Sequence, residues 1–323
     1  MVLIEFSEES GSPDLPHYMG LCSDKIGTPD LVVCLDSGAG DYNRFWTTTS
    51  LRGLIGLSMK VEVLSEGVHS GGASGHVPSS FRIARQLLSK LEDETTGEIL
   101  LDKLHTEIPE HRIKETQTLV SILGDEVVKE FPWKDKMRPS TDDKIEGVLR
   151  RTWKPALSIV GSDGLPPTAN AGNVLRPYTT LQLSMRIPPM VDAQEAKSAI
   201  ENALNENIPY GATVKLDFEE AADGWNAPET SPWLLDAIEK ASKQYFRQPP
   251  CSISEGGTIP FMAMLGEQFP RAQFVITGVL GPKSNAHGPN EFLHIPFAKK
   301  LTCCISSIPV SYTHLTLPTI LLV

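Results

Sequence analysis

The sequence has 323 residues and no uninterrupted run of 18 or more apolar ones, so no membrane-spanning helix is expected. Basic residues are also scarce: 29 Lys and Arg face 40 Asp and Glu, which gives a net charge of −11. A nucleic-acid-binding protein would need a basic footprint, and this chain has none. The apolar share of 40% and the charged share of 21% are ordinary for a globular protein with a sizeable core.

Cysteine is sparse as well, and the five residues form an odd number with no pair at metal-ligand spacing. We therefore expect small buried apolar side chains in a reducing compartment, not a disulfide framework. The first six residues, MVLIEF, are too short for a signal peptide and lack its basic region. A cytoplasmic protein is the resulting expectation.

Three short apolar runs are typical of strands in a sheet that is covered on both faces: residues 2–6, 31–35 and 274–277. Polar residues follow each run directly: Glu8 and Glu9, Asp36, and a glycine-rich loop that leads to His287. In open α/β sheets, functional sites gather beyond the carboxyl ends of the strands. The pattern predicts that these three strand ends converge on one site.

The middle of the chain has a different pattern. Residues 180–186 alternate between apolar and polar, which predicts a strand with one packed face. Asp192 and Glu195 form a capping box at the start of a helix. Further strands and helices around them predict an α+β domain with helices on one face of an antiparallel sheet. Pro309 is expected to end the helix around residues 297–308.

The residue types at the strand ends allow both structural and chemical roles. Adjacent carboxylates such as Glu8 and Glu9 are usually solvated surface charges, and Asp36 can cap a turn. At strand ends, however, one carboxylate can bind a metal while another accepts a proton from the metal-activated water. His287 stands between small residues and glycines, which suits a zinc ligand better than a core histidine.

Two glycine-rich turns carry further candidates. His69 lies in the sequence GVHSGG, and a turn histidine by itself is as often structural as functional. Glu255 opens the sequence EGGTIP, whose exposed backbone N–H groups and Thr258 hydroxyl can hold a carboxylate. No GK[ST] follows the glycines, so this loop is not a phosphate-binding loop.

Eight motifs together, in order and at plausible spacing, resemble one family: SEESGS, VVCLDSG, LRGLIG, SEGVHSGGASG, NVLRP, LSMRIPP, SEGGTIP and NAHGPNEF. The chain resembles the zinc-dependent metallopeptidases that include cytosolic non-specific dipeptidase and carnosinase-like dipeptidases, over roughly residues 1–308. The resemblance implies an α/β fold with a mixed-sheet catalytic domain, incomplete here, and an inserted α+β dimerisation (lid) domain. It also implies these boundaries: catalytic residues 1–53 and 222–309, inserted residues 54–221, and a non-native or disordered tail, residues 310–323.

The resemblance also assigns roles to individual residues. Glu8 is implied as the general base for the metal-bridging water. Glu9, Asp36 and His287 are implied as ligands of two divalent metal ions, zinc or manganese, in the full-length parent. The implied substrate-binding residues are His69, which reaches a partner's active site in a homodimer, with Asn173, Arg186, Gly257 and Thr258.

One departure from the family limits these expectations. The family's His-x-Asp motif and metal-bridging aspartate precede the paired glutamates, and neither stands before Glu8 here. We therefore expect the parent protein to be a dipeptidase, whose substrate is a dipeptide or short peptide, and this chain to lack two of five metal ligands. The alternatives are an aminoacylase or carboxypeptidase on the same scaffold, and a catalytically inactive dimerising fragment.

Overall fold

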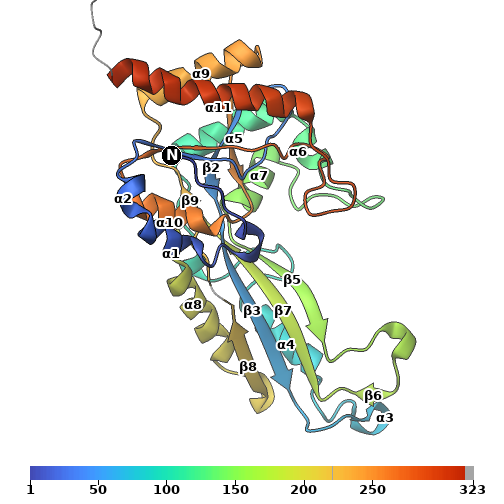
Figure 1. Cartoon of the computed structure of the whole chain (residues 1–323). Helices are drawn as coiled ribbons and strands as arrows, with labels where there is room; N and C mark the ends of the chain where they lie inside the picture. The colour runs from blue at the N-terminus through green and yellow to red at the C-terminus, as the bar shows by residue number, and fades with distance from the viewer. Residues whose placement is uncertain (220, 317–323) are drawn as a thin grey trace, which may run out of the picture.

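The computed structural model describes residues 1–219 and 221–316. It is an elongated molecule in which two sheets follow one another along the long axis (Figure 1). The strands are β1 Leu31–Cys34, β2 Trp46–Leu51, β3 Gly53–Glu62, β4 Val68–His69, β5 Ala156–Asp163, β6 Val174–Leu175, β7 Tyr178–Ile187, β8 Thr213–Phe218, β9 Trp225–Asn226, β10 Cys251–Glu255 and β11 Gln273–Ile276.

The α-helices are α1 Leu15–Leu21, α2 Ser23–Ile26, α3 Ser70–Ala73, α4 Ser80–Leu88, α5 Glu110–Leu123, α6 Glu126–Lys129, α7 Lys144–Thr152, α8 Ala193–Asn205, α9 Pro232–Tyr245, α10 Pro260–Gln268 and α11 Ile295–Thr316. Short 3-10 turns lie at Glu8–Ser10, Asp102–Leu104, Thr168–Asn170 and Pro209–Gly211. No helix in these described ranges is long and apolar enough to cross a membrane.

The first sheet has the strand order β1-β11-β2-β10, with β9 pairing to β2. β1 runs parallel to β11, whereas β11 and β2 are antiparallel, so the sheet is mixed as predicted. Successive residues of β11 face opposite cores: Val275 packs among the residues under α9 and α11, and Ile276 packs with Trp225 and Met262. The apolar runs 31–35 and 274–277 are thus strands covered on both faces.

The predicted strand at residues 2–6 is wrong. This segment has no regular secondary structure, and Val2 and Phe6 are 84% and 95% exposed. Five residues of high strand propensity form a strand only when another strand offers backbone partners and a buried face. Neither is available to this segment within the described chain, so propensity alone misled the prediction.

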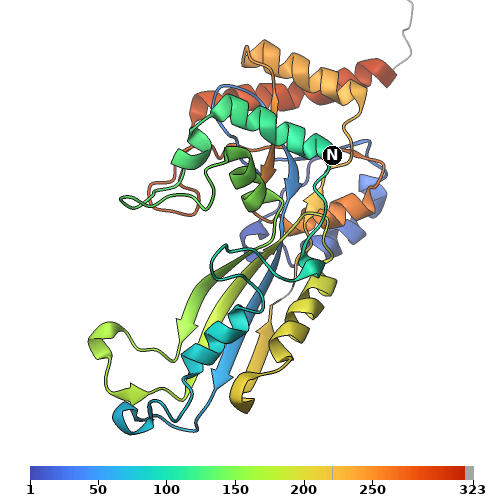
Figure 2. The ribbon, with the colours of Figure 1, turned by 180° about the vertical axis from the view of Figure 1, so that it is seen from behind.

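The second sheet has the order β5-β7-β3-β8 and is antiparallel throughout. The alternation at residues 180–186 is confirmed, because Leu181, Leu183 and Met185 are at most 4% exposed. Helices α4 and α8 lie side by side over this one face (Figure 2). Half of the predicted capping box is present: Asp192 Oδ1 accepts a hydrogen bond from the Glu195 backbone N–H at 2.8 Å, whereas the Glu195 carboxylate pairs with Lys103 at 3.3 Å.

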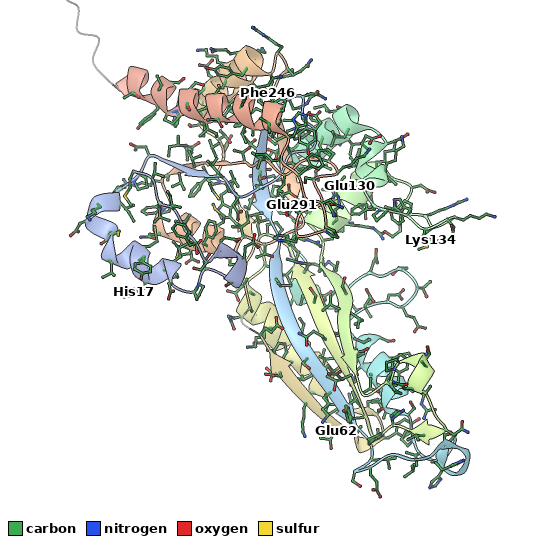
Figure 3. All side chains as sticks on the ribbon, turned by 45° about the vertical axis from the view of Figure 1, so that its right-hand side comes forward. His17, Glu62, Glu130, Lys134, Phe246 and Glu291 are labelled. Atoms are coloured by element: carbon green, nitrogen blue, oxygen red, sulfur yellow. The ribbon has the colours of Figure 1, made fainter. Side chains whose placement is uncertain are left out.

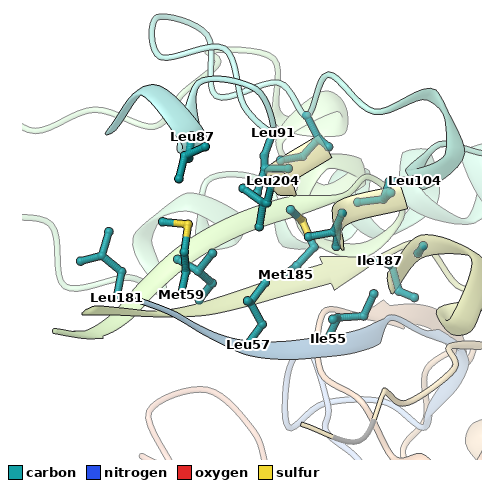
Figure 4. Close-up of a cluster of buried hydrophobic side chains, with 14 of the residues drawn as sticks. Ile55, Leu57, Met59, Leu87, Leu91, Leu104, Leu181, Met185, Ile187 and Leu204 are labelled. Carbon is teal, nitrogen blue, oxygen red and sulfur yellow. The ribbon is translucent and has the colours of Figure 1, made fainter. Parts of the chain in front are cut away.

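Cross-strand register builds the core of this second sheet. Leu57 lies opposite Leu183 and Ile55 lies opposite Met185, so apolar side chains of β3 and β7 share one face. Leucines from the covering helices, such as Leu87 and Leu204, complete the cluster (Figure 4). This arrangement is the α+β unit expected from the sequence.

Helices α5, α6 and α7 fall within residues 54–221, the predicted inserted domain, but they pack on the five-stranded sheet. Leu119, Val127 and Val148 from these helices belong to the core of the five-stranded sheet, and α5 contacts β10. The sequence between residues 92 and 152 is polar and charged, so its few buried residues gave no indication of which sheet they would cover.

The expected end of the last helix is also wrong. α11 continues through Pro309 to Thr316. Pro309 is exposed, and beyond it the ring of Tyr312 lies 4.7 Å from that of Trp233 on α9. Packing against α9 therefore holds the helix together across the proline, which cannot donate its own backbone hydrogen bond. The remaining tail residues, 317–323, lie outside the described residues.

Candidate functional site

The ends of β1 and β11 are joined by close backbone contacts. Thr277 N donates to Cys34 O at 3.0 Å, and Ala39 N donates to Leu280 O at 2.6 Å. A side chain at Gly278 would lie 1.7 Å from Ser37 O, so only glycine allows this approach. The two loops therefore leave the sheet together, which places Asp36 and the loop of His287 at the same edge.

A tight turn positions the paired glutamates. Glu8 and Glu9 lie in a 3-10 turn that ends at Gly11 in the left-handed region, with φ +83°. The carboxylate of Glu5 accepts hydrogen bonds from the hydroxyls of Ser7 and Ser12 at 3.1 and 3.0 Å, which closes the base of the turn. Local polar contacts, and not a strand, hold the two carboxylates.

These carboxylates share one region with Asp36 and His287. His287 Nδ1 lies 3.7 Å from Glu9 Oε2, and both side chains are highly exposed, so the pair adds little stability. Partial burial, then the charges of Asp36, Glu9 and Glu5, raise the pKa of Glu8, while His287 opposes this shift. The pKa of Asp36 is raised in the same way, by partial burial and then by Glu9 and Glu5.

The predicted ligands are therefore neighbours, but they do not form a closed coordination site. Within residues 1–219 and 221–316, no three His, Cys, Asp or Glu side chains are gathered closely enough to hold a metal ion. His287 itself is in the left-handed backbone region, with φ +58°, in a loop where Lys283, Asn285 and Asn290 share this conformation. Such a conformation is uncommon for residues other than glycine and is held here by the loop.

A second group forms at the junction of the two sheets. Arg186 Nη1 donates to Thr258 Oγ1 at 2.8 Å, and the same hydroxyl donates to Arg52 O at 2.6 Å. Burial lowers the pKa of Arg186. Gly257 is exposed with open space around it, so its backbone is accessible to a ligand. The structure thus brings together three of the five predicted substrate-binding residues.

The other two lie together at the far tip of the second sheet. His69 pairs with Val174 across the two-stranded sheet β4-β6, and Ser70 N donates to Asn173 O at 2.9 Å. Both side chains are exposed, and α3 and β6 lie at the end of the molecule opposite α9 and α11 (Figure 1). His69 Nδ1 accepts from Gly71 N at 3.1 Å, which leaves Nε2 as the ring N–H of a neutral imidazole.

Sequence reasoning missed Arg52, Arg151 and the half-buried position of Glu255. Arg52 is 8% exposed; burial, then the nearby charges of Arg186 and Arg151, lower its pKa to about 10. Burial raises the pKa of Glu255 to about 7, against the effect of Arg151. Charged residues are seldom buried, so the residue types alone did not predict buried positions. The sequence Arg52-Gly53 between two strand patterns was the only local indication for Arg52.

Known proteins share both sequence and fold with this chain. Residues 49–212 match the family model described as the M20 peptidase dimerisation domain. A curated relative, the cysteinylglycine-S-conjugate dipeptidase of Corynebacterium striatum, is 25% identical over an alignment of 312 residues that covers 92% of this chain. The chain spans 65% of the length of that relative.

Solved structures share the fold. The dipeptidase Dug1p of Saccharomyces cerevisiae matches 96% of this chain and 65% of its own, with TM-score 0.77 and 21% identity. Human carnosine dipeptidase 1 matches 95% and 64%, with TM-score 0.75 and 18% identity. The family model covers slightly more than half of the 323 residues. The family resemblance and the α/β fold predicted from the sequence are thereby confirmed, and the chain belongs to the M20 peptidase dimerisation-domain family.

Proposed function

We propose that this chain belongs to an enzyme that hydrolyses the peptide bond of dipeptides and short peptides with the help of divalent metal ions. The observation that supports this most is the meeting of Glu8, Glu9, Asp36 and His287 where β1 and β11 end. Its similarity to a bacterial dipeptidase points to the same substrate class. The cytoplasmic location remains a prediction.

The donor chemistry suits zinc or manganese. Glu9 and Asp36 offer carboxylate oxygens, and His287 offers an imidazole nitrogen. Burial, and then the charges of neighbouring carboxylates, raise the pKa values of Glu8 and Asp36, and a bound cation would relieve that repulsion. We propose two ions per subunit, with Glu9 and Asp36 each binding a different one and His287 as a further ligand. The three side chains would have to draw together on binding.

The proposed catalytic base is Glu8. A bound divalent ion would acidify the attacking water and polarise the peptide carbonyl. Glu8 would accept the proton of that water on its carboxylate, and its raised pKa makes it a stronger base than an ordinary glutamate. The hydrogen bonds from Ser7 and Ser12 to Glu5 would keep the turn in place during this transfer.

Arg186 and Thr258 would hold the substrate carboxylate. Only Nη1 of Arg186 is engaged in a described hydrogen bond, which leaves other guanidinium donors for two parallel bonds to a carboxylate. The accessible backbone of Gly257 would add a further donor.

His69 and Asn173 would act in the site of a second copy. Their position at the far tip, away from Glu8 and Asp36, supports a role across a homodimer, as does the family's dimerisation domain. The ring N–H at His69 Nε2 could then donate to the oxyanion that forms during hydrolysis.

The test compares the enzyme to which this chain belongs with its Glu8→Gln variant on dipeptides and on N-acyl amino acids, with added zinc or manganese. We expect dipeptide hydrolysis that falls about 10²-fold or more in Glu8→Gln, the usual contribution of a general base. Zinc binding, measured by calorimetry, should persist in Glu8→Gln and weaken in His287→Ala. Glu94→Gln, an exposed carboxylate on another loop, is the matched control.

Two outcomes would contradict the proposal. Turnover of N-acyl amino acids with inert dipeptides would assign an aminoacylase or carboxypeptidase instead. A folded dimer with less than one metal per chain and no hydrolysis would assign a non-catalytic dimerising protein. The lack of a ready three-ligand group in the described residues is the observation that favours this second candidate.

A further inference from the structure

A cavity of about 260 Å³ lies apart from the carboxylate cluster, between α6, α7, the loop that joins them and the start of β5. Its lining is mainly apolar and includes the rings of Phe131 and Trp133, which are 44% and 40% exposed. The same lining contains three guanidinium groups, those of Arg52, Arg150 and Arg151. Figure 3 shows Glu130 on this side of the molecule and Lys134 on the loop that projects from it.

Arg52 brings an unbalanced positive charge to this cavity. Its Nε donates to Gly256 O at 3.1 Å and its Nη1 donates to Lys154 O at 3.3 Å. Both acceptors are neutral carbonyls, and no carboxylate within the described ranges pairs with this guanidinium. A buried charge without a counterion is costly unless a ligand neutralises it.

The other cations in the lining already have carboxylate partners. Arg150 Nε lies 2.8 Å from Glu146 Oε1, Lys144 Nζ lies 2.6 Å from Asp125 Oδ1, and Arg151 pairs with Glu130. Arg151 Nε is nevertheless buried and donates to no acceptor in the part of the chain that the structure describes. Asp143, the acidic residue of the lining, accepts hydrogen bonds from Ile145 N and Glu146 N at the start of α7. Arg52 is therefore the cation of the lining that lacks a carboxylate partner among the described residues, which favours an anionic ligand.

We infer that this cavity binds a small amphipathic carboxylate, with its apolar group against Phe131 and Trp133 and its carboxylate facing Arg52 and Arg151. The volume, slightly below that of ordinary ligand pockets, limits the ligand to about the size of one amino acid. A purely inorganic anion would leave the apolar lining uncovered, and a neutral ligand would leave the charge of Arg52 unbalanced. The inference does not depend on hydrolase activity.

One loop separates this cavity from the group formed by Arg186 and Thr258. A side chain at Gly256 would lie 2.5 Å from Arg151 O and 3.2 Å from Arg52 Nη2, so the loop packs tightly against the cavity wall. The backbone carbonyl of Arg52 also accepts a hydrogen bond from the Thr258 hydroxyl. An anion bound to Arg52 is therefore expected to alter binding at Arg186, and the reverse must hold to the same extent.

Gly147 offers a way to fill the cavity without disturbing the fold. It lines the cavity on α7, and a Cβ added there would meet Thr141 Cγ2 at 3.7 Å, which is ordinary contact. Replacing a helical glycine by leucine also favours the helix. Gly20, on α1, is exposed with nothing within 4 Å, so Gly20→Leu is the matched control.

The experiment measures binding of hydrocinnamate by calorimetry and by the change in tryptophan fluorescence, with its neutral amide and inorganic phosphate as comparison probes. We expect hydrocinnamate to bind at least tenfold more tightly than either probe. Gly147→Leu should weaken binding at least tenfold, and Gly20→Leu should leave it unchanged.

Arg186→Met separates this cavity from the proposed substrate site. Binding that survives Arg186→Met but not Gly147→Leu supports the inference, whether or not peptides are hydrolysed. Three results would overturn it: no binding, equal binding of the amide, or binding that is lost in Arg186→Met while Gly147→Leu is unaffected.

Discussion

At the scale of single residues, Glu255 shows how the environment sets chemistry. It lies at the end of β10, and a side chain at Gly38 would come within 3.2 Å of its Oε1. Burial is the main cause that raises its pKa to about 7, with Glu130 adding to the shift and Arg151 opposing it. The folded protein therefore holds this proton to a higher pH than the unfolded chain does.

The sign of the pH effect follows from this shift. The unfolded chain releases the proton near pH 4.5, whereas the folded chain keeps it until about pH 7. The contribution to stability is complete below pH 4.5 and is lost as the pH rises through 7. At 1.36 kcal/mol for each unit, the loss is at most about 3 kcal/mol.

We predict that Glu255→Gln removes this loss. The free energy of unfolding, measured with urea at pH 5 and pH 8, should fall less between these two values in Glu255→Gln than in the wild type. Glu94→Gln, at an exposed position, should keep the wild-type difference. An identical difference in all three proteins would mean that Glu255 ionises as an ordinary carboxylate.

The residue types and their positions predicted part of the candidate site. Glu8, Glu9, Asp36 and His287 were identifiable because they follow apolar runs or stand among glycines. Arg52 was not, because its role depends on two distant backbone carbonyls, those of Lys154 and Gly256. These two contacts join residues that are separated by 102 and 204 positions in the chain, so no local sequence pattern indicates them.

At the scale of elements, β7 illustrates a reliable pattern and residues 2–6 an unreliable one. The strict alternation of β7 predicted both its strand and its packed face, since one period-2 pattern specifies the two together. The run at residues 2–6 lacks alternation, and whether it forms a strand depended on a partner strand beside it. Likewise, Pro309 does not end α11, because contact with α9 outweighs the missing hydrogen bond.

We predict that Leu183→Ala on β7 destabilises the second sheet. Leu183 is 1% exposed and packs in the cluster under α4 and α8, so the change leaves a cavity costing about 2–5 kcal/mol. Urea unfolding followed by circular dichroism measures the loss. Ser184→Ala, on the opposite face of the same strand, should change stability by less than about 0.5 kcal/mol. Equal losses in both variants would show that the faces are not distinct.

At the scale of the whole molecule, β5 forms one edge of the second sheet. Ile159 and Val160 on this strand are 47% and 64% exposed, and the strand pairs on one side with β7. An apolar sheet edge is a template for pairing with another chain. In a family named for its dimerisation domain, we propose this edge as the contact between two copies.

We predict that Val160→Lys converts a dimer into a monomer, because each copy would then bring a charged side chain into an apolar contact along a strand edge. Analytical ultracentrifugation over a range of protein concentrations measures the change. Leu235→Lys, at a residue of α9 that is 55% exposed, is the control and should leave the dimer intact. A Val160→Lys variant that stays dimeric would place the contact elsewhere.

The sequence by itself determined the local elements and their classes. Alternation, caps and apolar runs specified β1, β7, β11 and α8, and ordered motifs identified the family, because each depends on residues close together in the chain. Only the tertiary structure decided which sheet α5 to α7 cover, that residues 2–6 stay exposed, and that Arg52 is buried beside a cavity. These outcomes depend on partners far away in the chain, and burial and charge pairing are properties of that assembly rather than of any short segment.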